Sequence, residues 1–504
     1  MSTTDTENSK TPENKGMESQ PVESKTAESK TTESKITESK TTESKLADSK
    51  SVKGEVTESK SPDREARLPL YLFIEDVETL EHYQPGGYHP VKIGDYFHSR
   101  YRVIHKLGYG SYSTIWLARD EELDTFVALK ICVAKSSLRE MEILIMLQLH
   151  RAVLSQNPAN AMIKAMIPTI LDNFTIHGPN GSHPCYVTAL AMASLSDTKE
   201  ASRKRLFKPD VARSLAAQLA LTLDYVHAQG VVHGDLHLRN ILLKVLPEHQ
   251  ELTIEQLYNK YRPPELEPVI RLDGNPLPPG VPTHGVQYIW LGKRSEDIMR
   301  SEARLLLSDF GESFRPATEP KYHSNAPLIV RPPEARFEPE KPLSFSSDIW
   351  SLACVIWEII AQRSLFEGWF MTDDDMTREH VEALGILPPE WWNKWEARRD
   401  HFQEDGTPLS QEYRPLNLRF EDSVQEPRTK NGLSPLDAEE RDAILKMVRP
   451  MLSFRPEDRP NMQQILKSEW MVKWALPEYH KLIDNASISH GLPPEEPQTS
   501  HDAD

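Results

Sequence analysis

Two short polar segments carry residues whose types and spacing fit phosphoryl transfer. Asp235 and Asn240 lie between the apolar runs 231–232 and 241–243, so we expect a rigid loop to present them. The aspartate could accept or orient a hydroxyl proton, and the asparagine could bind a divalent cation beside the phosphates. Asp309 begins an Asp-Phe-Gly sequence after another apolar run, where its carboxylate could hold the metal that bridges nucleotide phosphates. Either segment alone could be a polar turn of the core, but the two together predict catalysis.

A lysine within an apolar strand is the third candidate for this chemistry. Lys130 lies in the run 126–131, and burying its charge is costly unless it meets a phosphate or a carboxylate. The helix predicted over 136–147 offers two partners, Glu140 and Glu142. We favour Glu140, because apolar residues follow it at positions +3, +4 and +7 and share its helix face. The alternative role of Glu140 is to cap the helix, since a serine stands three residues before it.

Two glycines between strand-like runs predict a hairpin that closes over phosphates. Gly108 and Gly110 follow the strand predicted over 101–107 and precede a β-branched and aromatic run. The backbone N–H groups of such a hairpin can bind phosphate oxygens. The residues that we expect to contact the nucleotide are Leu107, Gly108, Tyr109, Gly110, Ser111, Tyr112, Ser113, Thr114, Ile115 and Lys130.

The hydrophobic pattern also places the elements that must position these residues. Residues 210–228 have the spacing of an amphipathic helix, which ends at Gly230 and delivers the chain to the Asp235 loop. Residues 185–193 are typical of a strand and a crossover, and residues 349–360 are typical of a buried helix.

Composition and charge restrict the class of protein. The chain has 504 residues, of which 38% are hydrophobic, and a net charge of −17. Its three cysteines, Cys132, Cys185 and Cys354, are widely spaced and odd in number, which indicates a reducing compartment rather than disulfides or a zinc site. No signal-peptide core and no run of eighteen apolar residues occurs, so neither secretion nor membrane insertion is expected. The acidic body argues against nucleic acid as a direct ligand and suits a basic peptide.

Residues 1–66 contain a repeat of Glu-Ser-Lys followed by two variable positions, with almost no large apolar side chain. Such a segment cannot offset its ordering entropy by burial, so we predict a disordered tail. A linker is the plain interpretation, and the many serines leave a phosphorylatable regulatory arm as the alternative. Residues 479–504 are predicted to form a second disordered, acidic tail.

Taken together, the motifs resemble the signature set of the eukaryotic protein kinases. Pro332-Pro333-Glu334 and Asp348-Ile349-Trp350-Ser351 complete the set in the expected order, and the match covers about residues 80–475. Within the kinases, the segments 86–95 and 106–117 closely resemble the SR-protein kinases, which phosphorylate serines in Arg/Ser-rich splicing factors.

This resemblance implies an α+β, two-lobed protein kinase fold. The N-lobe would be a small antiparallel β-sheet with one main helix, and the C-lobe would be mostly helical. The expected bounds are 67–193 for the N-lobe with an N-terminal extension, and 194–478 for the C-lobe. A Pro-rich spacer at about 244–304 and a charged insert at about 396–432 interrupt the C-lobe. The spacer is either a tolerated surface loop or a docking or localisation segment.

The resemblance also assigns the catalytic roles. Asp235 would be the base, Asn240 and Asp309 would bind Mg²⁺, and Lys130, paired with Glu140, would hold the phosphates of ATP.

Further roles in the C-lobe follow from the same resemblance. Glu334 should form an ion pair with Arg459, and Asp348 should brace the backbone of the catalytic loop. The acidic residues between 373 and 382 could form a groove for Arg-rich peptides, or simply a solvated acidic turn.

Three positions depart from the kinase pattern. Gly234 stands where many kinases have an arginine that clamps a phosphorylated activation loop, so activity is not expected to wait for that phosphorylation. His237 stands where a lysine normally contacts the γ-phosphate, and either His237 or Arg239 would take over that contact. Phe310 replaces the leucine usual in SR-protein kinases, which alters packing more than chemistry.

The main functional hypothesis is an ATP- and Mg²⁺-dependent protein serine/threonine kinase acting on Arg/Ser-rich proteins such as splicing factors. It implies a cytoplasmic and nuclear monomer with no direct nucleic-acid or membrane partner. One alternative is a small-molecule phosphotransferase of the aminoglycoside or choline kinase type, because residues 233–237 resemble the loop of those enzymes. The constellation of Glu334, Asp348 and Arg459, which by the kinase resemblance shapes a peptide-binding C-lobe, argues against it. The other alternative is a pseudokinase scaffold, which the complete set of polar residues disfavours.

Overall fold

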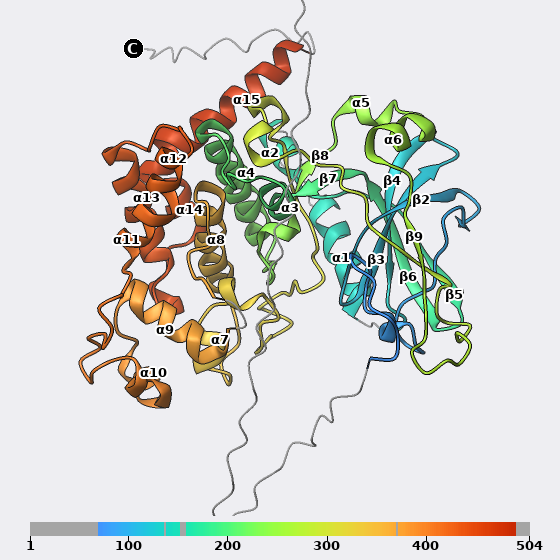
Figure 1. The fold of residues 1–504 in the computed structure, drawn as a ribbon. Coiled ribbons are helices and arrows are strands. Elements are labelled where there is room, and N and C mark those ends of the chain that lie inside the picture. The colour runs from blue at the N-terminus through green and yellow to red at the C-terminus, as the bar shows by residue number, and fades with distance from the viewer. Residues whose placement is uncertain (1–68, 136–137, 152–157, 369–370, 490–504) are drawn as a thin grey trace, which may run out of the picture. The chain divides into compact units, whose positions relative to one another are not determined.

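The predicted α+β architecture is confirmed by a computed structural model of the chain. An antiparallel sheet with one main helix is followed by a mostly helical part (Figure 1). None of the described helices is long and apolar enough to cross a membrane. The predicted tail 1–66 lies outside the described residues, which are 69–135, 138–151, 158–368 and 371–489.

The N-lobe is a six-stranded antiparallel sheet in the order β1-β2-β3-β4-β6-β5. Aromatic and β-branched side chains such as Tyr101, Trp116 and Val127 fill its core. The register places Lys130 of β4 opposite Ile115 of β3 and beside Tyr186 of β6. The elements are β1 Tyr96–Phe97, β2 Tyr101–Gly110, β3 Ser113–Asp120, β4 Thr125–Cys132, β5 Ile170–Gly178, β6 Gly181–Ala189 and the helices α1 Leu138–Arg151 and α2 Pro158–Lys164.

The C-lobe is built around two buried helices, α4 and α8. α4 (Pro209–Ala228) begins with a proline, which is well placed at the first helical position. It ends before Gly230, whose φ of 75° lies in the left-handed region that glycine adopts without strain. α8 (Phe345–Ile360) is buried along almost its whole length, which confirms the predicted buried helix.

Shorter helices surround this pair. In Figure 1 the orange and red helices α9 to α15 belong to this lobe. The remaining elements are α3 Leu195–Glu200, α7 Glu334–Phe337, α9 Asp373–Leu384, α10 Pro389–Lys394, α11 Leu416–Phe420, α12 Glu426–Lys430, α13 Ala438–Met451, α14 Met462–Leu466, α15 Leu476–Ser489, the π-helices η7 Glu421–Gln425 and η9 Met471–Ala475, and the 3-10 turns η1 Leu80–His82, η2 Leu238–Asn240, η3 Ser295–Asp297, η4 Arg300–Glu302, η5 Leu328–Val330, η6 Glu396–Asp400 and η8 Pro456–Asp458.

A small sheet in the order β11-β8-β7 holds both polar segments of the candidate site. β8 (Ile241–Lys244) follows Asn240 directly, and β11 (Leu305–Leu307) ends just before Ser308 and Asp309. The two strands pair in antiparallel register, with Leu307 opposite Ile241, and β7 is Ala191–Ser194. Because this register joins the end of one strand to the start of the other, segments far apart in the sequence emerge side by side.

Much of the predicted spacer is folded onto the N-lobe. It contains α5 (Pro247–Gln250), α6 (Ile254–Tyr261) and a hairpin of β9 (Leu266–Pro268) with β10 (His284–Val286). Leu257 of α6 packs with Ile104 and Leu117 of the N-lobe sheet. The segment after β9 pairs with the N-terminal extension, where the Leu72 N–H donates to the Ile270 carbonyl over 2.9 Å. The spacer is therefore folded and partly buried against the N-lobe, which a surface loop without structure of its own would not be.

The end of the chain corrects one prediction. Residues 479–504 were expected to be disordered, but α15 continues to Ser489. Tyr479 and Leu482 are buried, and α15 lies along α4. The polar composition predicted that the entropy cost of ordering would prevent folding here, but the burial of these side chains offsets that cost. Residues 490–504 lie outside the described residues.

Candidate active site

The catalytic loop is held from below by one buried carboxylate of α8. Asp348 accepts hydrogen bonds from the main-chain N–H groups of His233 (2.7 Å) and Gly234 (2.9 Å). It also contacts the His227 ring nitrogen at 2.9 Å. Burial raises the pKa of the Asp348 carboxyl, but the hydrogen bond with His227 and the main-chain donors outweigh it, so that the pKa lies below its usual value. The expectation that Asp348 braces the loop is confirmed.

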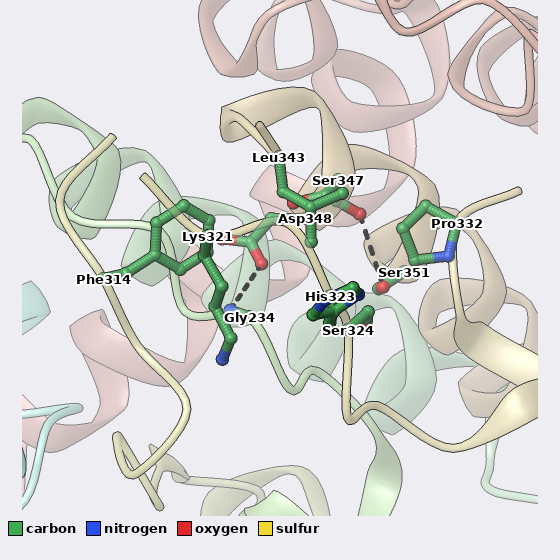
Figure 2. A pocket seen from close by; sticks show the side chains of 10 residues that line it. All are labelled: Gly234, Phe314, Lys321, His323, Ser324, Pro332, Leu343, Ser347, Asp348 and Ser351. Atoms are coloured by element: carbon green, nitrogen blue, oxygen red, sulfur yellow. Dashed lines mark hydrogen bonds between the residues drawn. The ribbon is translucent and has the colours of Figure 1, made fainter. Parts of the chain in front are cut away.

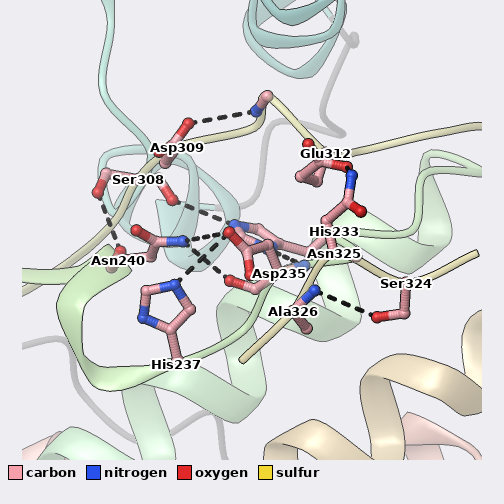
Figure 3. Close-up of polar contacts among 12 residues, drawn as sticks. His233, Asp235, His237, Asn240, Ser308, Asp309, Glu312, Ser324, Asn325 and Ala326 are labelled. Carbon is pink, nitrogen blue, oxygen red and sulfur yellow. Dashed lines mark hydrogen bonds and ion pairs between the residues drawn. The ribbon is translucent and has the colours of Figure 1, made fainter. Parts of the chain in front are cut away.

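Asp235 and Asn240 meet within this loop (Figure 3). The Asn240 side-chain nitrogen donates to the Asp235 main-chain oxygen (2.9 Å) and to its carboxylate oxygen Oδ2 (3.2 Å). The other carboxylate oxygen, Oδ1, is buried and has no hydrogen-bond partner among the described residues. A buried carboxylate oxygen without a donor is costly, and it is the atom available to accept a proton from a bound hydroxyl.

Lys130 is held between two carboxylates, although not the pair that the sequence suggested. Its ammonium lies 2.8 Å from Glu142 and 3.1 Å from Asp309. Burial opposes the charge, but the attraction of Asp309 and Glu142 outweighs it and holds the pKa of Lys130 well above its usual value. Lys130 is therefore a permanent cation at the base of the site.

The choice of Glu140 as the partner of Lys130 is corrected to Glu142. Among the side chains of α1 that the structure describes, the buried ones are Glu142, Ile145, Met146 and Leu149, which recur at helical spacing and form the face toward the sheet. The apolar run after Glu140 is long enough to supply the buried face of a helix in two different rotations. Leu144, the residue at position +4 from Glu140, is 54% exposed and therefore does not lie on the buried face. The side chain of Glu140 lies outside the described residues.

Sequence reasoning also missed Tyr186 of β6. Its hydroxyl donates to Glu142 over 2.8 Å, and Lys130 lies 5.4 Å from the centre of its ring. The phenol thus fixes the carboxylate that holds the lysine. The buried 142–145–146–149 pattern could have identified Glu142, but only the strand register shows that Tyr186 stands beside Lys130.

The predicted glycine-rich hairpin is present. β2 and β3 join through Ser111 and Tyr112, and the last paired residues are Gly110 and Ser113. The Val133 N–H donates to the Tyr112 carbonyl over 2.9 Å and ties the hairpin tip to the end of β4. Of the predicted nucleotide residues, Ser113 and Thr114 are buried, Leu107, Gly108 and Ile115 are partly exposed, and Tyr109, Gly110, Ser111 and Tyr112 are exposed.

The Asp-Phe-Gly segment projects its aspartate into the same region as the loop. Asp309 has a φ of 60°, a strained left-handed conformation for a residue other than glycine. Phe310 is completely buried against the His233 ring, with ring centres 4.9 Å apart. The buried phenylalanine anchors the turn, so that the Asp309 carboxylate remains 43% exposed beside Lys130.

The oxygen atoms present suit Mg²⁺. The Asn240 amide nitrogen is used as a donor to Asp235, which leaves its oxygen as a hard ligand beside the exposed Asp309 carboxylate. No cluster of three or more His, Cys, Asp or Glu able to hold a metal occurs among the described residues. Asn240 and Asp309 would therefore hold Mg²⁺ only together with the oxygens of phosphates and water, as expected for a nucleotide-bound ion.

Gly234 borders a small pocket beneath the segment that follows Asp309 (Figure 2). It has a φ of 79°, and a Cβ atom there would lie 2.7 Å from the Glu312 carbonyl oxygen, so a side chain would not fit without a backbone shift. The Lys321 ammonium donates to that same carbonyl (2.8 Å) and to the Glu312 carboxylate (2.6 Å). An ion pair within the segment thus tethers it beside Gly234, where the kinase resemblance would place an arginine that clamps a phosphate.

His237, and not Arg239, lies beside Asp235. The His237 Nε2 atom is 3.5 Å from Asp235 Oδ2, and Figure 3 shows the ring beside that carboxylate. Arg239 is 72% exposed and lies 3.9 Å from Glu200 of α3. Of the two substitutes considered for the missing lysine, the geometry favours His237.

The expected Glu334–Arg459 ion pair is confirmed. The guanidinium of Arg459 donates to both carboxylate oxygens of Glu334, over 2.8 and 2.6 Å. Arg459 also donates to the carbonyls of Ser346 and Phe454. This buried, bidentate pair joins the segment around Glu334 to the start of α8.

The acidic residues between 373 and 382 lie in α9, and several of them already have cationic partners. Asp374 pairs with Arg336 and accepts from the Trp395 ring N–H, and Asp375 caps α9. Glu379 is buried on Arg419 at 2.6 Å, and Glu382 lies 3.5 Å from the same guanidinium. Glu379 and Glu382 are thus paired with Arg419, whereas Asp373 is exposed and the Asp374 side chain is 50% exposed at the start of α9.

Comparisons with known proteins agree with this geometry. Residues 101–254 and 293–471 match the family model of the protein kinase domain. A serine/threonine protein kinase of Aspergillus fumigatus is 27% identical over 412 residues, which are 78% of this chain and 90% of that protein. The serine/threonine-protein kinase SRPK of Physarum polycephalum is 25% identical over 429 residues, 79% of this chain and 92% of that protein. SRSF protein kinase 3 of Homo sapiens is 36% identical over 172 residues, 34% of this chain and 30% of that protein.

Proposed function

Because the chain belongs to the SR-protein kinase family of protein serine/threonine kinases, we propose that it transfers the γ-phosphate of ATP to serines in Arg/Ser-rich proteins such as splicing factors. The observation that carries this proposal is the convergence of four groups. Lys130 and Asp309 are in direct contact, and Asp235 and Asn240 share a hydrogen bond. β8 and β11 position the two pairs side by side.

In the proposed reaction the oxygen of a serine hydroxyl attacks the γ-phosphorus. The bond from that phosphorus to the β,γ-bridging oxygen breaks, ADP leaves, and the hydroxyl proton passes to the Oδ1 atom of Asp235. Mg²⁺, when bound with the nucleotide, neutralises charge on the phosphate oxygens. Lys130 and the backbone of the glycine-rich hairpin hold the phosphates in line with the hydroxyl.

The C-lobe supports a peptide substrate. The Glu334–Arg459 pair fixes the segment between Asp309 and α8, along which we propose that the substrate chain binds. With a net charge of −17, the molecule attracts Arg-rich chains over long range. We propose further that the protein works as a monomer in cytoplasm and nucleus, without a nucleic-acid or membrane partner.

The decisive experiment compares the purified protein with its Asp235→Asn variant. Both receive labelled ATP, Mg²⁺ and an Arg/Ser-repeat peptide, with a basic tyrosine peptide, choline and an aminoglycoside in parallel. We expect serine labelling that falls by about 10²- to 10⁴-fold in the variant, while both proteins bind ATP equally. Transfer only to the small molecules would support the small-molecule phosphotransferase instead. If the wild-type protein binds ATP but transfers phosphate to none of the acceptors, the result would support the pseudokinase scaffold.

A further inference from the structure

A segment outside the matched kinase domain contacts the nucleotide-binding hairpin. Tyr88 precedes residue 101, where the family match begins, and it is 3% exposed. Its hydroxyl donates to the carbonyl oxygen of Gly110 over 2.7 Å. Gly110 is the last residue of β2 before the hairpin turn, so this hydrogen bond acts where the hairpin must present its N–H groups.

The peptide bond passes this restraint on to the next residue. The carbonyl of Gly110 and the N–H of Ser111 belong to one planar, trans unit, in which they point in opposite directions. Fixing the Gly110 carbonyl toward Tyr88 therefore fixes the Ser111 N–H away from it. Ser111 lies in the turn of the hairpin and is exposed, which leaves its N–H free of the strand pairing between Gly110 and Ser113.

Tyr88 is itself rigidly positioned. Its own carbonyl accepts from the side-chain nitrogen of Asn180 over 2.7 Å, and the same nitrogen donates to Gly280 of the spacer. The Lys135 N–H donates to the Gly86 carbonyl over 2.8 Å. At Gly87 a Cβ atom would lie 1.8 Å from the His82 carbonyl oxygen, so only glycine allows the chain to turn there. The main chain around Tyr88 is thus held by contacts with the β5–β6 turn, the end of β4 and the spacer.

We propose that Tyr88 is a positioning residue for ATP, whose phenol orients the peptide unit between Gly110 and Ser111 so that the Ser111 N–H meets a phosphate of the nucleotide. This inference rests on the proposed function, since it concerns the same nucleotide site. Tyr88 contacts no substrate and acts only through the hairpin backbone. Gly110 is exposed, so water can replace the phenol as its donor, and loss of the hydroxyl should affect orientation more than folding.

The test compares Tyr88→Phe with Tyr258→Phe, which removes a closely similar bond. Tyr258 also donates its hydroxyl to a main-chain carbonyl of β2, that of Ile104, over 2.9 Å. Ile104 lies in the first half of β2, whereas Gly110 is its last residue. The two variants therefore remove a hydrogen bond from different parts of the same strand. Binding of Mg²⁺-ATP and of adenosine is measured by calorimetry, together with the KM values for ATP and for the Arg/Ser peptide.

We expect Tyr88→Phe to weaken ATP binding about three- to tenfold, the loss of roughly one hydrogen bond, without changing adenosine binding or the KM for peptide. Tyr258→Phe should leave all three unchanged. ATP affinity in Tyr88→Phe within twofold of the control, or an equal loss for adenosine, would overturn the inference while leaving the proposed function intact. A wild-type protein that binds no Mg²⁺-ATP would overturn the proposed function itself.

Ser111→Pro provides a second test on the exposed hairpin, independent of the buried phenol. Proline removes the N–H to which we assign the phosphate contact, so Ser111→Pro should weaken ATP binding. In this background Tyr88→Phe should weaken it no further, because both changes act on one contact. Additive losses in the double variant would contradict a role of Tyr88 through Ser111.

Discussion

At the scale of single residues, the site depends on a lysine whose charge is held by buried carboxylates. Lys130 and Glu142 are both buried, and Asp309 completes the contact. Removing one partner of a buried pair leaves the other charge uncompensated, whereas the intact pair contributes little net stability. The function of the arrangement is therefore to position Lys130, and variants of its partners should affect catalysis.

Glu142→Gln is predicted to lower kcat/KM for ATP by roughly 10²-fold, because the neutral amide no longer holds the Lys130 ammonium against the phosphates. Glu140→Gln, on the same helix, should leave kcat/KM nearly unchanged, because Lys130 pairs with Glu142 and Asp309. Steady-state kinetics at saturating peptide measures kcat/KM for ATP in the two variants and in the wild-type protein. The reverse order of effects would restore Glu140 as the partner of Lys130.

His237 is predicted to assist transfer, and Arg239 is not. His237→Ala should lower kcat by about 10²-fold, the usual cost of removing one donor from a developing phosphate charge, with little change in the KM for ATP. Arg239→Ala should leave kcat nearly unchanged, because its guanidinium faces Glu200 and solvent. His237→Lys should recover activity, since a lysine occupies this position in most serine/threonine kinases. Equal kcat values for His237→Ala and wild type would exclude the assignment.

At the scale of elements, part of the spacer contributes side chains to the hydrophobic core of the N-lobe. Leu257 of α6 is 2% exposed and packs under β2, whereas Leu272, further along the same spacer, is 54% exposed. The fold of the nucleotide-binding lobe therefore includes residues that lie in sequence between Asn240 and Asp309.

Leu257→Ala is predicted to lower the free energy of unfolding by about 2–5 kcal/mol, the usual cost of a cavity at a buried leucine. Leu272→Ala removes the same atoms from solvent-exposed surface and should cost less than about 0.5 kcal/mol. Urea denaturation followed by tryptophan fluorescence measures both values. Equal midpoints for the two variants would indicate that the spacer does not contribute to the core.

At the scale of the whole molecule, acid stability should be limited by buried neutral histidines. His380 of α9 lies between Trp350 and Phe366, with ring centres 5.0 and 4.5 Å away. Burial, helped by the nearby Arg419, Arg336 and Arg459, lowers the pKa of His380 to about 3. Burial likewise lowers the pKa of His89 to about 4. Between these values and the ordinary pKa of about 6.5, only the unfolded chain binds the proton.

The fold should therefore lose stability as pH falls below about 6.5, and this loss should be smaller in His380→Leu. Between about pH 7 and pH 5.5 the difference should be about 1 kcal/mol for this one group. Urea denaturation at the two pH values measures it, with the exposed His284 changed to leucine as the control. An acid sensitivity of His380→Leu equal to that of the control would contradict the prediction.

Local patterns were sufficient for much of the fold. The strands of the hairpin, the strand of Lys130, the helix before the catalytic loop and the buried helix after Asp348 all follow from apolar spacing and flanking glycines. The order of the motifs, through the kinase resemblance, implied which residues should meet. In the structure the pairing of β8 with β11 brings the Asp235–Asn240 loop and Asp309 together. The strands and helices depend on neighbouring residues, which is why the sequence alone could predict them, whereas the meeting of the two polar segments was implied only by the kinase resemblance.

The sequence by itself placed individual strands and helices, because their periods are local properties, and its resemblance to the protein kinases implied the α+β class and the polar residues of the site. Only the tertiary structure decided between Glu140 and Glu142, since a long apolar run in α1 fits either face until a sheet packs on one of them. It also decided that the spacer and α15 are folded, and that Tyr88 reaches Gly110. Those outcomes depend on burial against distant segments, and burial is a property of the packed chain rather than of any one stretch of it.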